Sequence, residues 1–433
     1  MRLRHWLRHK TIGKKLTRGA RPRKGVEVRR LTVMHPVPVA VPPALAHQST
    51  LREANLGVVL RSVCAAEEPL SRAGVATGTG LTRSTVSRLV DELVAGGLVE
   101  EGTALLAGPG RPATPLLPSS RVCAVGLQVN AAHVAARLLD LRGRVVAESR
   151  SEPDLVGSEP AAGLALLADH LAEVLGAVPT GGRVLGAGLA LPGVVDAAGE
   201  RLLHAPNLGW RDLDPGPDLR ALLDGIPLNL ANEANLAAHA FAEPAPGRRG
   251  RSGHFVYVSG EIGIGGAVVT DWRVQTGLHG FAGEIGHMPF RPGGDPCPCG
   301  SDGCLERYAG RLAMTRRAGL PPGTTLAELD RRAEEGHVPA KEAIDLAAEA
   351  LGVVLAGVVN LLDVPTIVLG GEIGDLADRI TPTVTERLRA RVMAADFMPL
   401  EVVRDADDVP GATGGALLHL SRVAAGPAGF LTA

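Results

Sequence analysis

The residues best suited to chemistry gather in the segment 280–310, which reads GFAGEIGHMPFRPGGDPCPCGSDGCLERYAG. Three of the five cysteines of the chain, Cys297, Cys299 and Cys304, lie within eight residues, and His287 precedes them. Thiolate and imidazole are the ligands that zinc prefers in closed tetrahedral sites. Glycine and proline favour the tight turns that bring short side chains together. The segment therefore predicts a structural Cys3His zinc site, and the alternative is a chance cluster of reduced thiols.

The same residues carry a resemblance to a known family. Glu284-Ile285-Gly286-His287 comes first, followed by Cys297-x-Cys299-Gly300-x-x-Gly303-Cys304-Leu305-Glu306. This pattern resembles the signature of the ROK family, which contains sugar kinases and sugar-responsive transcriptional regulators. The resemblance extends from Val122 to near the C-terminus, and it leaves the choice between the two branches open.

The resemblance also implies a sugar site, made of Asn232, Glu233, Glu284, His287 and Glu306. Carboxylates and amides can accept hydrogen bonds from sugar hydroxyls, and amides can donate to them. We expect His287 to use one ring nitrogen for zinc and the other for a hydroxyl. Each position also has a structural alternative: an N-cap for Asn232, a solvated helix position for Glu284 and an exposed salt bridge for Glu306.

The loops that hold nucleotide phosphates in the kinases of this family are altered in this chain. The first reads Gln128-Val129-Asn130-Ala131-Ala132, where ROK kinases carry Asp-x-Gly-Gly-Thr. Glutamine cannot hold Mg²⁺ as a carboxylate does, and alanine blocks close approach of the backbone to phosphate. In the second loop Glu261 replaces the usual Thr, and a carboxylate repels a triphosphate. The chain is therefore predicted to lack enzymatic activity and to bind no ATP.

Three further positions in the chain allow more than one interpretation. Glu233 is one methylene longer than the Asp that acts as the base in the kinases, so we interpret it as a binding residue. Gly370-Gly371 resembles an adenosine-side turn, although a glycine pair between strand and helix is common for structural reasons alone. Trp210 resembles a residue at the mouth of the family's cleft, where it would either stack on a sugar or serve as a buried anchor.

Two α/β lobes are expected to position these residues. Each begins with a predicted three-strand meander, at 122–129, 133–141 and 145–149 in the first lobe and at 254–259, 265–270 and 273–275 in the second. Further predictions are a strand at 228–230 and a helix at 161–175, then helices at 341–361, 375–391 and 411–423 and strands at 366–369 and 400–404. This is the plan of the actin-like ATPase (ribonuclease H-like) fold, which the resemblance also implies. The domain is predicted to span 118–433, with lobes at about 118–240 and 241–410 and the last helix returning to the first lobe.

Residues 49–117 predict a winged helix-turn-helix DNA-binding domain. Apolar residues at helical spacing predict a first helix from Ser49, and a short second helix is expected at 71–77. Thr82 is expected to cap a third helix, 83–95, with Val86, Leu89, Val90 and Leu93 on its apolar face. The opposite face presents Arg83, Ser84, Ser87 and Arg88, whose side chains suit base edges and phosphates in a major groove.

A wing is expected to follow the third helix. It would leave along 98–100, turn through 108–112 and return along 115–117. Arg111, between Gly110 and Pro112, suits insertion into a narrow minor groove. The alternative for this domain is a small helical bundle that contacts proteins.

The segment 1–48 is basic and rich in proline, with twelve Lys or Arg and only Glu27 as an acid within residues 1–32. Its low apolar content predicts disorder. It would serve as an auxiliary arm for DNA phosphates, or it would reflect a start codon assigned too early. Arg29-Arg30 superficially resembles a twin-arginine export signal, but prolines interrupt the apolar stretch that follows. No apolar run is expected to reach the roughly twenty residues that span a membrane, so a cytoplasmic location is expected.

Together these features predict a cytoplasmic, sugar-responsive repressor of carbohydrate-metabolism genes without kinase activity. Its expected partners are palindromic double-stranded DNA, a monosaccharide or sugar phosphate effector, and a second copy of the chain. One alternative is an active ROK sugar kinase with a DNA-binding head. Another is a regulator that responds to a partner protein and leaves the cleft residues unused.

Overall fold

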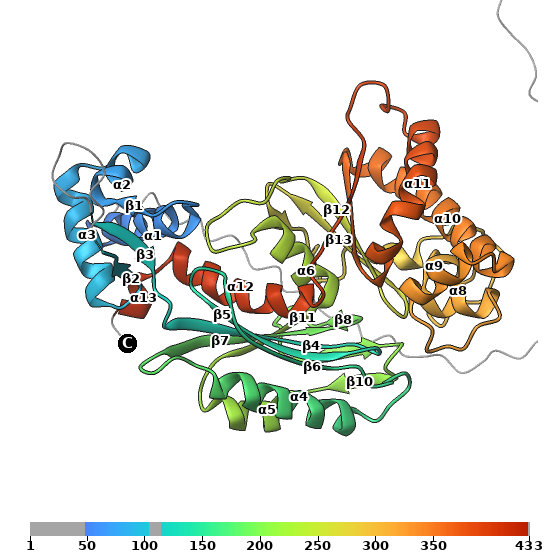
Figure 1. Ribbon diagram of the computed structural model, residues 1–433, viewed down its shortest axis with the longest axis horizontal. Coiled ribbons are helices and arrows are strands. Elements are labelled where there is room, and N and C mark those ends of the chain that lie inside the picture. Colours follow the sequence, from blue (N-terminus) through green and yellow to red (C-terminus); the bar gives the residue numbers. More distant parts are fainter. Residues whose placement is uncertain (1–47, 104–113, 432–433) are drawn as a thin grey trace, which may run out of the picture. The chain divides into compact units, whose positions relative to one another are not determined.

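The computed structural model describes residues 48–103 and 114–431 (Figure 1). Two five-stranded sheets form the centres of two α/β lobes, each of which begins with an antiparallel meander. The predicted two-lobe α/β fold is therefore confirmed. The basic segment before residue 48 and Arg111 of the wing lie outside the described residues, so the expectations for them stay predictions.

A small helical domain precedes the lobes. It contains α1 (Gln48–Ala65), β1 (Leu70–Ser71), α2 (Arg72–Thr79), α3 (Arg83–Ala95), β2 (Val99–Glu101) and β3 (Pro115–Pro118). Thr82 caps α3 as expected, because its side chain accepts a hydrogen bond from the Thr85 amide. Arg72 joins α2 to α3 and to the wing, donating to the Ser87 carbonyl (2.9 Å) and the Glu101 carboxylate (2.8 Å). This is a helix-turn-helix followed by the paired strands of a wing.

The first lobe has the strand order β11-β7-β4-β5-β6. These strands are β4 (Val122–Val129), β5 (Val134–Asp140), β6 (Val145–Ser151), β7 (Arg183–Leu191) and β11 (Leu228–Asn232). Helices α4 (Pro160–Gly176) and α5 (Gly216–Leu223) cover one face. A small sheet of β8 (Val194–Val195), β9 (Leu202–Ala205) and β10 (Trp210–Leu213), absent from the sequence-based expectation, lies at its end.

The second lobe has the strand order β14-β13-β12-β15-β16. Its strands are β12 (Phe255–Gly260), β13 (Ile264–Thr270), β14 (Arg273–Val274), β15 (Thr366–Gly371) and β16 (Glu401–Arg404). Its helices are α6 (Glu233–Ala242), α7 (Glu306–Ala309), α8 (Arg311–Arg317), α9 (Leu326–Glu334), α10 (Val338–Leu362) and α11 (Ala377–Arg391), with 3-10 turns η1 (Ile285–His287) and η2 (Glu372–Leu376).

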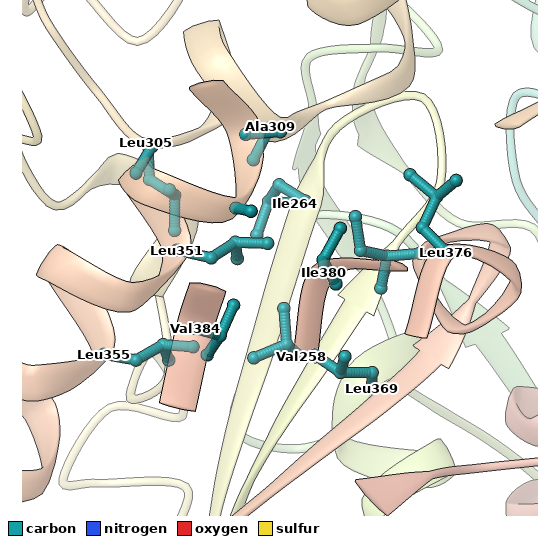
Figure 2. Close-up of a cluster of buried hydrophobic side chains, with 14 of the residues drawn as sticks. Val258, Ile264, Leu305, Ala309, Leu351, Leu355, Leu369, Leu376, Ile380 and Val384 are labelled. Atoms are coloured by element: carbon teal, nitrogen blue, oxygen red, sulfur yellow. The ribbon is translucent and has the colours of Figure 1, made fainter. Parts of the chain in front are cut away.

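Both faces of the second sheet are buried, which explains why β12 is apolar without alternation. Phe255 and Tyr257 pack against α6, whereas Val256 and Val258 pack into the core beneath α10 and α11. Figure 2 shows Val258 in that core beside Ile380 and other side chains from α10, α11 and β15.

Helix α10 corrects the expectation that no stretch could span a membrane. Its 25 residues are long and apolar enough by length and composition, but 61% of its most apolar window is buried inside the protein. Alanine and valine on nearly all sides pack this helix between α11 and the helices α7, α8 and α9. It is a core helix.

Helix α12 (Pro410–Ala425) returns to the first lobe and covers the second face of its sheet (Figure 1). A Cβ atom on Gly126 of β4 would collide with the Ala412 carbonyl, and one on Gly188 of β7 would approach the Gly415 backbone to 2.5 Å. These glycines therefore permit close contact between helix and sheet. The same helix also contacts α1 of the DNA-binding head, and α13 (Ala428–Leu431) follows it.

Candidate functional site

A pocket between the two lobes collects the polar residues that the sequence singled out. The first lobe contributes its turn after β4 and the end of β11, and the second lobe contributes the β12–β13 turn and the cysteine segment. The polar and charged residues that line it are Asn130, Asn207, Asn232, Glu233, Asn235, Glu261, Glu284, His287 and Glu306, together with the thiol of Cys299. The five residues of the predicted sugar set thus line one cavity.

Asn232 ends β11 and caps α6. Its Oδ1 accepts from the amides of Ala234 (2.9 Å) and Asn235 (3.2 Å), and its Nδ2 donates to the Gly193 carbonyl (2.8 Å). The structure therefore supports the N-cap interpretation of this residue, and its amide has little capacity left for a ligand.

Glu233 follows at the first position of α6 and is 9% exposed. Burial raises the pKa of its carboxyl group to about 7, and a hydrogen bond from Asn130 only partly opposes this shift. Among the described residues its Oε2 atom has no hydrogen-bond partner. A buried oxygen without a partner is costly unless a ligand or water satisfies it. Glu233 is therefore ready to accept a hydrogen bond from a bound hydroxyl.

Glu306 and Glu284 enter the pocket from the two ends of the cysteine segment. The Oε2 atom of Glu306 accepts from the Ile264 amide at 3.3 Å and lies where a Cβ atom on Gly263 would stand, so glycine is needed there. Glu284 Oε2 lies 3.9 Å from His287 Nε2. Burial raises the pKa of Glu284, His287 lowers it and Glu306 raises it further. Glu306 is half-buried, whereas the side chain of Glu284 is 45% exposed and stays partly in contact with solvent.

The cysteine segment brings its four candidate ligands together. The ligand atoms of His287, Cys297, Cys299 and Cys304 all lie within 4.8 Å of one another. His287 Nδ1 lies 3.7 Å from Cys297 Sγ, and the sulfurs of Cys299 and Cys304 are 3.7 Å apart. This cluster could hold a metal ion such as zinc. The Nε2 atom of His287 would remain on the pocket side, facing Glu284.

The altered first phosphate loop is occupied by contacts within the protein. Gln128 is 2% exposed, and its Oε1 accepts from the Ala412 amide of α12 at 3.0 Å. Asn130 closes the turn by accepting from the amides of Ala132 and His133, each at 2.8 Å. The side chains of Gln128 and Asn130, in the loop that holds phosphate in the family's kinases, thus bind α12 and the turn itself.

A second pocket adjoins the first at Glu261, which lines both. Seven acidic residues line it, Glu152, Glu261, Glu372, Asp375, Asp405, Asp407 and Asp408, with three arginines. Each arginine is paired: Arg311 with Glu372, Arg150 with Asp408 at 3.2 Å, and Arg404 with Asp375 at 2.7 Å. This wall disfavours a triphosphate, because its positive charges are already neutralised.

The glycine pair Gly370-Gly371 is required for packing inside the protein. A Cβ atom on Gly370 would collide with the Tyr257 hydroxyl, and one on Gly371 would come within 2.5 Å of Glu261 Oε1. Trp210 is likewise structural: it is 1% exposed and its Nε1 donates to the Ser158 carbonyl at 2.9 Å. The buried-anchor interpretation of Trp210 is therefore correct and stacking on a sugar is excluded.

The outward face of α3 remains free of the protein interior. Arg83, Ser84 and Arg88 are exposed and Ser87 is half-buried. In the described part of the chain neither arginine forms an ion pair, so both guanidinium groups are available to a partner.

Four polar pocket residues were missed as ligand contacts: Asn130, Asn207, Asn235 and Glu261. Asn130 and Glu261 were noted only as departures from the phosphate loops, and Asn207 and Asn235 were given no role. No local pattern distinguishes such residues, because they reach the pocket from separate segments of the chain. The sequence indicated these residues only indirectly, because they lie in segments that resemble the cleft segments of the family.

Comparisons with known proteins agree with this architecture. Residues 124–422 match the ROK family model, and residues 56–102 match the IclR helix-turn-helix domain. The chain is 26% identical over 378 residues to the xylose repressor of Caldicellulosiruptor bescii, an alignment that covers 83% of this chain and 93% of the relative.

Solved structures show the same fold. A ROK family transcriptional regulator described as a homologue of the Escherichia coli Mlc protein superposes with a TM-score of 0.69 at 23% identity, covering 88% of this chain and 98% of that one. A ROK hexokinase from Thermus thermophilus superposes with a TM-score of 0.55 at 28% identity, covering 68% and 97%. The regulator match thus includes more of this chain than the kinase match does.

Proposed function

The chain belongs to the ROK family, and from that premise we propose that it is a cytoplasmic, sugar-responsive transcriptional repressor of carbohydrate-metabolism genes. The observation that carries the proposal is the combination of an exposed recognition helix with a pocket whose sugar side retains an unpartnered buried carboxylate. A relative over most of the chain is named a xylose repressor, which supports this branch of the family.

The DNA side of the proposal rests on α3. Arg83, Ser84, Ser87 and Arg88 would reach base edges and phosphates in a major groove, and Arg111 would enter the adjacent minor groove. Because such heads bind palindromic operators as dimers, the working species is a homodimer on double-stranded DNA.

The sugar side rests on Glu233, Glu284, His287 and Glu306, with Asn232 shaping the wall through its cap. A sugar can change DNA affinity only if it favours one arrangement of the heads over another. Helix α12 is placed to couple the two, since it contacts the sheet of the first lobe, α6 and α1 of the head.

Zinc is the metal that the donor set favours, because three thiolates and one imidazole match its tetrahedral preference. The ion would be structural, and it would hold His287 with its Nε2 atom toward the sugar. The proposal includes no kinase activity and no ATP, which the engaged Gln128 and the acidic second pocket support.

The proposal is tested by fluorescence anisotropy of the purified protein on the DNA upstream of its own gene, titrated with monosaccharides without ATP. We expect at least one sugar to lower DNA affinity, and Glu306→Gln to raise the required sugar concentration at least about 10-fold, because a buried hydrogen bond to a charged group is lost. Tight DNA binding that ignores every sugar would favour control by a partner protein. ATP consumption with any sugar would favour the kinase alternative.

The DNA contact is tested separately. We expect Arg88→Ala to weaken operator binding about 10- to 100-fold, the range for an arginine that contacts a base. Arg389→Ala, at an exposed position of α11 in the second lobe, is the matched control and should leave operator affinity unchanged. Equal effects of the two variants on operator affinity would contradict a contact between α3 and DNA.

A further inference from the structure

The charges around the interlobe pocket are of one sign. Four carboxyl groups line it, from Glu233, Glu261, Glu284 and Glu306, and among the described residues no lysine or arginine does. The only basic side chain in the lining is that of His287, whose Nδ1 faces the cysteine cluster. A phosphate ester entering this pocket would give up its hydration without gaining a fixed cation.

Glu261 forms the boundary between the two pockets. Among the described residues it is the one that lines both. Its backbone is held on both sides, since its amide donates to the Gly263 carbonyl (3.0 Å) and its carbonyl accepts from the Arg311 amide (3.2 Å). Its carboxyl group lies against Gly371. Glu261 is therefore a fixed acidic wall between the sugar pocket and the second pocket.

The carboxyl group of Glu261 is influenced by burial and by the neighbouring carboxyl group of Glu233. Burial raises the pKa of Glu261 most, and the neighbouring carboxyl groups of Glu233 and Glu372 raise it further. When two carboxyl groups lie near one another, a protonated one can donate to a hydroxyl oxygen while its neighbour accepts from the hydroxyl proton. That arrangement fits an uncharged polyol.

Beyond this wall, the described residues that line the second pocket offer a phosphate no arginine without an ion-pair partner. The arginines of the second pocket are each committed to a carboxylate, and the Arg311–Glu372 pair nearest to Glu261 is largely buried. A phosphate on the sugar would meet carboxyl groups both within the pocket and behind it.

We propose that the pocket selects an uncharged, unphosphorylated monosaccharide and rejects its phosphate esters, and that Glu261 is the residue that sets this selectivity. The inference rests on the proposed function and narrows its effector class. It goes beyond the family's sugar set, because Glu261 stands outside that set and departs from the family's loop.

The test uses the full-length protein on its operator and compares matched pairs: glucose with glucose 6-phosphate, and N-acetylglucosamine with N-acetylglucosamine 6-phosphate, with xylose and further pentoses and hexoses beside their phosphates. We expect the active sugar to change DNA affinity at a concentration at least about 10-fold lower than its ester, equivalent to about 1.4 kcal/mol. Because this comparison uses the wild-type protein, it does not depend on the folding of a variant.

The role of Glu261 is tested with Glu261→Gln, which keeps the shape and replaces the acid with a neutral amide. For each ligand we measure the concentration that produces half of the change in DNA affinity. The readout is this concentration for the ester divided by that for the sugar, and we expect the ratio to fall about 10-fold, or about 1.4 kcal/mol. Glu152→Gln is the matched control: Glu152 lines only the second pocket, its side chain is 73% exposed, and the ratio should not change.

The outcomes separate the inference from the proposed function. An ester that acts at a lower concentration than its parent sugar, or a ratio that Glu261→Gln leaves unchanged, overturns the selectivity while the sugar-responsive function stands. If neither sugars nor esters change DNA affinity, the proposed function fails and the inference fails with it.

Discussion

The two neighbouring pockets of the cleft differ in how their charged groups are satisfied. In the sugar pocket the Oε2 atom of Glu233 has no partner among the described residues, and Glu284 faces His287 at the long distance of 3.9 Å. In the second pocket the arginines bind the carboxylates directly, as in the 2.7 Å pair of Arg404 and Asp375. Unsatisfied groups indicate a site kept for a ligand, whereas mutual pairing indicates a cavity stabilised without one.

The first pocket is held by local turns and by the cysteine segment, and the second is held by its own ion pairs. Substitutions in the first pocket should therefore change ligand response, and substitutions in the second should change stability.

The largest expected effect comes from the metal cluster, which borders only the sugar pocket. We expect Cys304→Ser or a strong chelator to remove about one zinc per chain and to destabilise the second lobe by several kcal/mol, because metal binding and folding of such sites are coupled. Metal analysis and thermal unfolding followed by circular dichroism measure both changes. The response to sugar should be lost together with the metal, since Cys299 lines the pocket.

Cys64→Ala provides the control for this prediction. Cys64 is a buried thiol of the DNA-binding head, so its removal should leave the zinc content unchanged. Loss of zinc without any change in melting temperature or sugar response would contradict a structural role for the metal.

The second effect concerns the second pocket. Arg311→Ala leaves Glu372 largely buried without its partner, and such a change costs about 3–5 kcal/mol of folding free energy. Urea unfolding measures the loss. Arg311→Ala combined with Glu372→Ala removes both charges and should recover part of the stability. If the single variant instead kept its stability and lost its sugar response, the contrast between the two pockets would be wrong.

The smallest of the three effects depends on pH. Burial raises the pKa of Glu233 from its ordinary 4.5 to about 7, so the folded protein holds this proton more tightly than the unfolded chain. The stability that this group contributes is complete below pH 4.5 and is lost as the pH rises through 7, by about 3 kcal/mol in total. Glu233→Gln stays neutral, so its stability relative to the wild type should rise by about that amount between pH 4.5 and pH 8.

Chemical denaturation at pH 5 and pH 8 checks this expectation. The difference between variant and wild type removes the contribution of titrating groups that do not interact with Glu233. Glu342→Gln, at an exposed position of α10, should show no such trend. A difference between Glu233→Gln and wild type that is the same at both pH values would place Glu233 in contact with solvent.

Much of the DNA-binding head and of the cysteine segment could be predicted from the sequence. Helix α3 was expected at 83–95 and begins and ends at those residues, because its Thr82 cap and its apolar repeat act within a few residues of chain. The second helix extends two residues further than expected, to Thr79, because Gly80 adopts the left-handed conformation that ends it. Strands β7 and β8–β10 and helices α5 and α7–α9 were missed; several of these elements are short, but β7, with nine residues in the interior of the first sheet, is not.

The sequence by itself determined which side chains were available for zinc, sugar and DNA, because motifs such as Cys297-x-Cys299 act through neighbours along the chain. Only the tertiary structure decided their use. Gln128 meets the Ala412 amide across 284 positions of sequence, Trp210 is buried beneath α4, and Glu261 becomes a wall because Gly371 and Glu233 lie on either side of it. Contacts between distant segments depend on how the elements pack, and that packing is a property of the whole fold.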